Sequence, residues 1–157
     1  MERSAGIIPY KISDDGKVLF FVGHPGGPFW NGKEYYAFMK GHIEDGETEF
    51  DAALREFKEE TGINLPINGD YNFLGCVRQN SKKTVCAFSI EFDLDETNCK
   101  SNTCEVEIPT NDGKKIIEVS EIDDYKWMDY DHLKKVTNFK HLLFYEKIIN
   151  IVNDRNS

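Results

Sequence analysis

The sequence lacks long apolar runs: no stretch approaches the roughly 18 residues that a membrane-spanning helix requires. The N-terminal segment MERSAGIIPY carries charged residues at once and has no long apolar core, so it does not resemble a secretory signal. We therefore expect a protein without a membrane partner, located in the cytoplasm.

Cysteine is scarce and follows no metal-binding pattern. Cys76, Cys86, Cys99 and Cys104 include no C-x-x-C pair, which argues against a zinc ribbon. A disulfide framework is typical of small secreted domains rather than of a chain of this length without a signal sequence. The sequence therefore predicts four reduced cysteines.

An excess of basic residues is also missing. The chain has 28 Asp and Glu against 19 Lys and Arg, for a net charge of −9. Such a chain is a poor candidate for binding nucleic acid through counterion release, so no nucleic-acid partner is expected. It can still bind phosphate groups if a divalent cation lies between the two negative partners.

The chain length of 157 residues and its content of 39% hydrophobic and 13% aromatic residues predict a single globular domain over residues 1–157. Apolar runs and turn signals predict a mixed α/β arrangement. The predicted strands lie at 5–12, 17–24, 36–41, 71–79 and 83–94, with a weaker signal at 104–108 inside an irregular polar segment. The predicted helices lie at 48–61, near 131–136 and at 138–155.

The segment 48–61 has the clearest helical pattern. Thr48 suits the N-cap, with Asp51 three residues later, and Gly62 suits the left-handed position after the last turn. Phe50, Ala53, Leu54 and Phe57 fall at helical spacing and predict an apolar stripe that faces the core.

A second stripe of this helix is acidic. Glu56, Glu59 and Glu60 lie three and four positions apart, where each pair of like charges costs roughly 0.2–0.5 kcal/mol. They also lie near the C-terminal end, where the helix dipole disfavours negative charge. Such a stripe is either a solvated face of an acidic protein or a preorganised metal site. The preceding KGHIEDGE, rich in Gly and Glu, favours the metal site, because hard cations need several oxygen ligands.

The whole stretch GHIEDGETEFDAALREFKEETGI, residues 41–63, resembles the Nudix box. That pattern is Gly, five residues, Glu, seven residues, Arg-Glu, a bulky apolar residue, any residue, Glu-Glu, any residue, Gly and a bulky apolar residue. The matching positions are Gly41, Glu47, Arg55, Glu56, Phe57, Glu59, Glu60, Gly62 and Ile63.

The resemblance implies an α+β fold, a Nudix-type α/β/α sandwich around a mixed β-sheet. It implies metal-dependent hydrolysis of a pyrophosphate bond in a nucleoside diphosphate derivative, with Mg²⁺ as the cofactor and Mn²⁺ as the alternative. The chemistry agrees, because pyrophosphate cleavage needs charge neutralisation on the phosphate oxygens and a positioned water.

The resemblance also assigns roles by position. Glu59 and Glu60 would be metal ligands beside the Gly41 carbonyl, and Glu56 would be a further ligand or the general base. Arg55 would orient the catalytic carboxylates Glu56 and Glu59. Two box residues would be structural: Glu47, which with Arg55 holds the helix to the loop, and Gly62. Many Nudix enzymes recruit an acidic residue from a later loop, for which we predict Glu121, then Glu118, with Glu105 and Glu107 as further candidates.

Substrate signals lie outside the box. Lys40 could contact phosphate, and Trp30 and Tyr36 could stack on a base. KGHIEDGET resembles the segment that leads into the box in dinucleoside polyphosphate hydrolases, although Met39 stands where those enzymes usually have Pro. Arg78 stands where ADP-ribose hydrolases often have Pro. We expect a nucleoside triphosphate or a dinucleoside polyphosphate as the small-molecule partner.

A non-catalytic Nudix-fold module that binds or senses a nucleotide is the alternative function. Such members usually lose box glutamates or the arginine, and here all are intact, which favours the enzyme. For the oligomeric state, the sequence is compatible with a monomer and with a homodimer.

Overall fold

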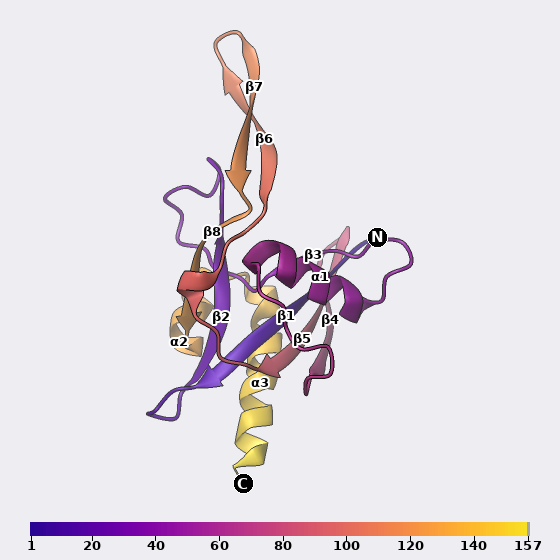
Figure 1. The fold of residues 1–157 in the computed structure, drawn as a ribbon, viewed down its shortest axis with the longest axis vertical. Coiled ribbons are helices and arrows are strands. Elements are labelled where there is room, and N and C mark those ends of the chain that lie inside the picture. Colours follow the sequence, from indigo (N-terminus) through magenta and orange to yellow (C-terminus); the bar gives the residue numbers. More distant parts are fainter. Residues whose placement is uncertain (157) are drawn as a thin grey trace.

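The computed structural model describes residues 1–156, and its centre is a six-stranded mixed sheet (Figure 1). The strand order is β4-β5-β1-β2-β8, and β3 pairs with the N-terminal part of β1. Only β1 and β5 run parallel; the other neighbours in this sheet are antiparallel. The strands are β1 (Glu2–Ile12), β2 (Val18–Pro25), β3 (Lys40–His42), β4 (Asn72–Asn80), β5 (Lys83–Glu91) and β8 (Ile122–Met128).

Alternating side chains of the central strands build a hydrophobic core on each face of the sheet. Ile7 and Phe21 pack toward helix α1 (Glu49–Thr61). Ile8 and Phe20 contribute to the opposite core, which α2 (Tyr130–Val136) and α3 (Leu142–Arg155) help to form. The short 3₁₀ helix η2 (Phe139–His141) places the buried His141 against Phe38. The expected α/β/α sandwich with a mixed sheet is therefore confirmed, because period-two strands bury apolar residues on both sides.

The boundaries of α1 follow its capping residues. The Thr48 Oγ1 atom accepts a hydrogen bond from the Asp51 backbone N–H at 3.1 Å, and Gly62 adopts φ 76° after the last turn. Ala53 and Phe57 are fully buried, as the predicted stripe requires, and Ala52 is buried beside them. Phe50 and Leu54 are half-buried at the edge of the same core.

Two further strands, β6 (Thr103–Thr110) and β7 (Gly113–Ser120), form a separate hairpin that projects from the body of the molecule (Figure 1). The sequence predicts only a short strand at 104–108 in this segment, and its pattern predicts neither β8 nor the 3₁₀ turn η1 (Glu96–Asn98). The sequence Asn-Asp-Gly at the hairpin tip is a recognised turn signal. The run Cys-Glu-Val-Glu-Ile at 104–108 alternates as a half-exposed strand requires, whereas β7, with two adjacent isoleucines, is less regular.

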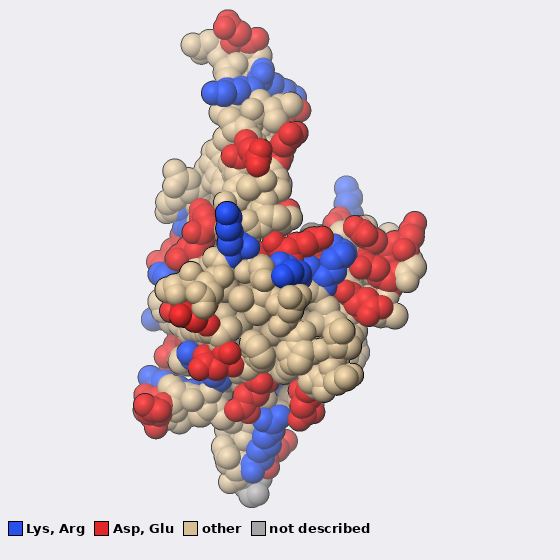
Figure 2. All heavy atoms as spheres, viewed as in Figure 1, with Lys and Arg blue, Asp and Glu red and all other residues tan. Residues whose placement is uncertain are grey.

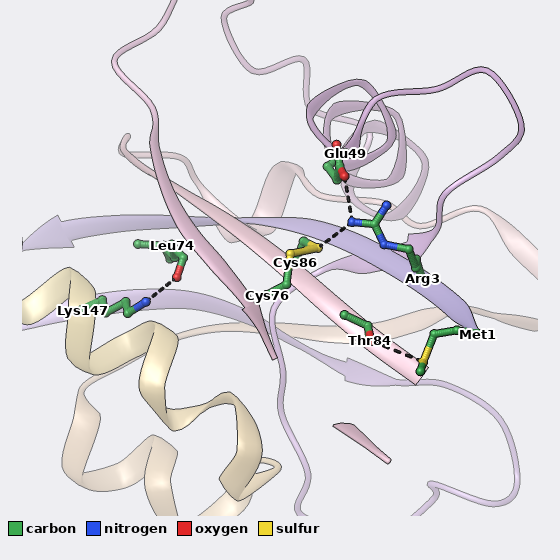
Figure 3. The surroundings of a disulfide bond; sticks show 8 residues. All are labelled: Met1, Arg3, Glu49, Leu74, Cys76, Thr84, Cys86 and Lys147. Carbon is green, nitrogen blue, oxygen red and sulfur yellow. Dashed lines mark hydrogen bonds and ion pairs between the residues drawn. A yellow bond between two sulfur atoms is a disulfide. The ribbon is translucent and has the colours of Figure 1, made fainter. Parts of the chain in front are cut away.

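The prediction of four reduced cysteines is wrong for one pair, since Cys76 and Cys86 form a disulfide (Figure 3). They are directly opposite each other on the antiparallel strands β4 and β5. A cross-strand pairing of this kind depends on register, which cysteine spacing alone does not reveal. Arg3 approaches the Cys86 sulfur at 3.6 Å and forms an ion pair with Glu49 at 2.7 Å. Cys99 and Cys104 are free thiols.

Among residues 1–156, no helix is both long enough and apolar enough to cross a membrane.

Candidate active site

The acidic stripe of α1 faces the short strand β3 at very close range. A Cβ atom at Gly41 would lie 2.0 Å from the Glu56 carboxyl carbon, so only glycine permits this approach. Acidic side chains gather over α1 and the loop that precedes it (Figure 2). The box residues thus form one continuous unit of strand end, loop and helix.

Arg55 connects this unit. Its Nε and Nη2 atoms donate to the two carboxylate oxygens of Glu47 at 2.8 and 2.9 Å, and Nη2 also donates to the His42 carbonyl at 2.9 Å. Nη1 donates to Glu56 at 2.9 Å and to Glu59 at 3.3 Å. The hydrogen bond from Arg55 holds the pKa of Glu47 down at about 2. One guanidinium therefore fixes the loop and orients two carboxylates of the helix.

Glu60 is the most confined of the acidic residues, with 7% of its surface exposed. Its Oε2 atom is buried and has no hydrogen-bond partner. Burial, followed by the charges of Glu56 and Glu121, raises the pKa of Glu60 to about 9 against an opposing effect of Lys40. Burial also raises the pKa of Glu56, with Arg55 opposing, and burial and Glu59 raise that of Glu121. The carboxylates thus repel one another in a confined space.

The described part of the chain contains no group of three or more His, Cys, Asp or Glu side chains arranged to hold a metal ion. The donor chemistry nevertheless fits a hard divalent cation. The buried Glu60 oxygen lacks a partner, and the charges of Glu56, Glu59 and Glu121 act on it. Carboxylates, a loop carbonyl and water are the ligands that such cations take. A cation would draw these oxygens together and remove the repulsion.

Glu121 reaches the end of α1 through a series of backbone hydrogen bonds. The Asn102 N–H donates to the Glu59 carbonyl at 2.9 Å, and the Glu121 N–H donates to the Asn102 carbonyl at 3.0 Å. The Gly26 N–H then donates to the Glu121 carbonyl at 2.9 Å. These contacts join α1, the base of the hairpin and the loop after β2.

A pocket of about 310 Å³ opens beside the acidic residues. Lys40, Glu60 and Glu121 line it together with the aromatic residues Trp30 and Tyr35. The Trp30 and Tyr35 rings are stacked with their centres 4.8 Å apart. Burial lowers the pKa of Lys40 to about 8, with a further contribution from the charge of Lys83 and an opposing one from Glu60. The pocket is thus lined by both charged and aromatic side chains.

The sequence model of the NUDIX domain matches residues 2–148. The chain belongs to the Nudix family. It is accordingly a Nudix pyrophosphohydrolase, and Nudix hydrolases generally use divalent metal ions. No curated protein matches the chain closely enough to add to this identification.

Solved Nudix structures share the fold. A C. elegans Ap4A hydrolase, solved as a binary complex, is 19% identical with a TM-score of 0.59, and the match covers 96% of this chain and 98% of that one. A MutT/Nudix family protein of Listeria innocua is 12% identical with a TM-score of 0.63, covering 98% and 95%. The Nudix domain of Shewanella oneidensis NrtR, complexed with ADP ribose, is 12% identical with a TM-score of 0.59, covering 99% and 88%. These identities establish the fold alone.

The structure brings together most of the residues predicted for the Nudix site. Lys40, Trp30 and Glu121 line one pocket with Glu60. Tyr36 does not line it: its hydroxyl donates to Asp124 in a separate hollow beside His24. The neighbouring Tyr35 takes its place in the pocket, because adjacent residues of an extended segment face opposite sides.

The other predicted acidic residues lie on the hairpin. Glu118 accepts a hydrogen bond from the Thr103 hydroxyl, and Glu107 pairs with Lys114 at 3.3 Å. The structure therefore separates Glu105, Glu107 and Glu118, on the exposed face of the ribbon, from Glu121 at its base. Sequence proximity alone contained no signal for this separation.

Proposed function

We propose that this Nudix domain hydrolyses a pyrophosphate bond in a nucleoside diphosphate derivative with Mg²⁺ as its cofactor, Mn²⁺ being the alternative. The observation that carries the proposal is the buried, unpartnered oxygen of Glu60 at the wall of a pocket that also contains Lys40 and Trp30. The acidic side chains of this pocket suit a cation, and its aromatic side chains suit a base.

We assign Gly41, Glu56, Glu59, Glu60 and Glu121 as the residues that would hold the ion. The bound ion would supply charge neutralisation on the phosphate oxygens and activation of the attacking water. Arg55 holds Glu56 and Glu59 in position through its hydrogen bonds. Glu56, whose pKa is raised by burial, is suited to accept a proton from that water.

Lys40 and the aromatic side chains position the substrate. Lys40 lines the same pocket as Glu60, and its ammonium group is our candidate to pair with a phosphate oxygen. Trp30 and Tyr35 offer a stacked aromatic surface for a base. The phosphates therefore lie toward α1 and the base toward the loop after β2.

We place a nucleoside triphosphate or a dinucleoside polyphosphate first among the substrates. The segment leading into the box and the fold shared with the C. elegans Ap4A hydrolase support this choice. ADP-ribose belongs in the test panel because the NrtR Nudix domain binds it. A nucleotide sensor without turnover is the second candidate, and the intact box argues against it.

The experiment measures product release from nucleoside triphosphates, diadenosine polyphosphates, ADP-ribose and sugar nucleotides with and without Mg²⁺. We expect turnover of at least one compound, dependent on the ion, and its loss in Glu59→Gln with an unchanged fold. Glu49→Gln on the same helix is the matched control, since Glu49 pairs with Arg3 away from the pocket. Nucleotide binding without any turnover by the native protein would establish the sensor instead.

A further inference from the structure

His24 is buried near the end of β2, with 9% of its surface exposed. Each of its ring nitrogens faces an oxygen atom. Nδ1 lies 2.6 Å from a carboxylate oxygen of Asp123, and Nε2 lies 2.7 Å from the main-chain carbonyl oxygen of Lys33. An ionised carboxylate and a carbonyl only accept hydrogen bonds, so the ring satisfies both contacts only when both nitrogens carry a proton. The geometry thus requires the charged imidazolium form of His24.

Lys33 belongs to the loop of residues 26–35, which extends beside the base of the hairpin (Figure 1). The same loop presents Trp30 and Tyr35 to the pocket that contains Glu60. The Lys33 N–H donates to the Trp30 carbonyl at 3.0 Å, and the Tyr35 N–H donates to the Lys33 carbonyl at 3.1 Å. The backbone of Lys33 is therefore bonded to both aromatic residues, so fixing Lys33 also fixes their stacked rings.

The middle of this loop has little support from the sheet. Main-chain hydrogen bonds hold its two ends, at Gly26 and Ala37, whereas residues 31–34 between them are exposed. The His24 ring ties this exposed middle to Asp123 of β8. We call its two contacts, to Asp123 and to Lys33, the His24 bridge. The bridge thus joins the loop that carries the aromatic side chains to the rigid edge of the sheet.

The surroundings of the ring favour its charged form. The titratable and charged side chains that share a hollow with it are Lys33, Glu34 and Tyr36 of the loop segment and Asp123, Asp124 and Lys126 of β8. Burial lowers the pKa of His24, but the hydrogen bonds to Asp123 and to the Lys33 carbonyl, with the Asp123 charge, outweigh it, so the pKa lies above 6.5. Asp124 is itself occupied, since it accepts a hydrogen bond from the Tyr36 hydroxyl at 2.5 Å.

We propose that His24 is a positioning residue of the substrate pocket, whose charged ring holds the loop of residues 26–35 against β8 and keeps Trp30 and Tyr35 stacked. Its kinetic consequences rest on the proposed function. When the ring loses a proton, one nitrogen presents a lone pair to an oxygen and one of the two hydrogen bonds is lost. The bridge is therefore complete below pH 6.5 and is lost as the pH rises through the pKa of His24 in the folded protein.

The direct test needs neither substrate nor metal. NMR of the imidazole nitrogens measures the protonation of His24 against pH, and amide hydrogen exchange of residues 27–35, corrected for the intrinsic exchange rate, measures opening of the loop. The loss of one charged hydrogen bond predicts that opening increases about 10- to 150-fold as the ring deprotonates. The two pH midpoints should coincide. A ring that is neutral at pH 6, or a loop that opens equally at pH 6 and pH 9, would overturn the proposal.

Three variants separate a positioning role from a merely structural one. Asp123→Asn retains an oxygen acceptor for Nδ1 but removes the charge, so the midpoint should move to lower pH. His24→Gln should make loop opening independent of pH. His132→Gln is the matched control, because His132 is exposed and meets the loop only through Glu34 at 3.4 Å, so the midpoint should not change. An unshifted midpoint in Asp123→Asn would contradict the proposal even if His24→Gln fails to fold.

The kinetic readout is the ratio of wild type to His24→Gln at each pH, for a nucleotide that the enzyme hydrolyses. The ratio of KM values should rise through the midpoint measured by NMR, and the ratio of kcat values should stay constant, because the bridge positions the aromatic side chains and not the acidic ones. Absence of hydrolysis with a pH-dependent loop would remove the proposed function and retain the bridge. Normal hydrolysis with KM ratios that do not change with pH would remove the positioning role instead.

Discussion

Replacing Glu60 by Gln should stabilise the protein when no divalent cation is present. The neutral amide has nearly the shape of the protonated carboxyl group and cannot repel Glu56, Glu59 or Glu121. In the folded protein the pKa of Glu60 is raised to about 9 by burial and then by its acidic neighbours. A residue that we propose as a metal ligand thus lowers the stability of the metal-free fold.

The magnitude follows from linkage between protonation and folding. An acidic group whose pKa is higher in the folded than in the unfolded state destabilises the folded protein at any pH above the unfolded-state pKa. The loss of folding free energy grows as the pH rises toward the folded-state pKa. Because the pKa of Glu60 rises from 4.5 in the unfolded chain to about 9 in the folded protein, the free energy of unfolding at pH 7 is lower by about 3 kcal/mol. For a chain of this length, that corresponds to a melting temperature higher by about 6–12 °C in Glu60→Gln.

Urea denaturation in EDTA at pH 7 and pH 4 measures this difference. The variant should be more stable by about 3 kcal/mol at pH 7, and the advantage should vanish near pH 4, where the unfolded carboxyl is also protonated. Mg²⁺ at 100 times its Kd should stabilise the wild type by about 2.7 kcal/mol and leave the variant almost unchanged. A variant that is no more stable than the wild type at pH 7 without cations would refute the reasoning.

Two further predictions concern other residues of the fold. Arg55→Lys keeps the charge but loses the forked pair of hydrogen bonds to Glu47. A charged hydrogen bond is worth about 1.5–3 kcal/mol, so kcat should fall about 10- to 150-fold. An unchanged kcat in steady-state kinetics would contradict this prediction. Burial, with Lys40 and Lys83, lowers the pKa of His141 from 6.5 to about 3, so its contribution to stability is complete above pH 6.5 and is lost as pH falls toward 3. When the pH is lowered from 7.5 to 5, the free energy of unfolding of His141→Gln should therefore fall by about 2 kcal/mol less than that of the wild type, as measured by urea denaturation. An equal fall in both proteins would contradict this prediction.

The sequence predicted the parts of the site that depend on short-range pattern. The spacing of Gly41, Arg55 and Glu60 is local, and the structure packs the strand that contains Gly41 against the helix that contains Arg55 and Glu60. The two cores also follow from local alternation and helical periodicity. Interactions within one or two turns of a helix are encoded by neighbouring residues, so one sequence suffices to predict them.

Features that depend on long-range register were missed or left open. Cys76 and Cys86 meet through strand pairing, and Glu121 reaches α1 only through Asn102. Whether Tyr35 or Tyr36 faces the pocket depends on how one extended segment is rotated. None of these outcomes has a signature in residue spacing, because tertiary contacts decide among conformations that are locally equivalent.

The backbone of Asn102 gives the hairpin a mechanical connection to the acidic residues. Its N–H and carbonyl bond to Glu59 and Glu121 respectively, so one peptide segment at the base of β6 spans both sides of the acidic group. A tilt of the ribbon must therefore change the separation between the end of α1 and Glu121 or break one of these bonds. Anything that restrains this tilt would therefore also hold the distance between Glu59 and Glu121 fixed.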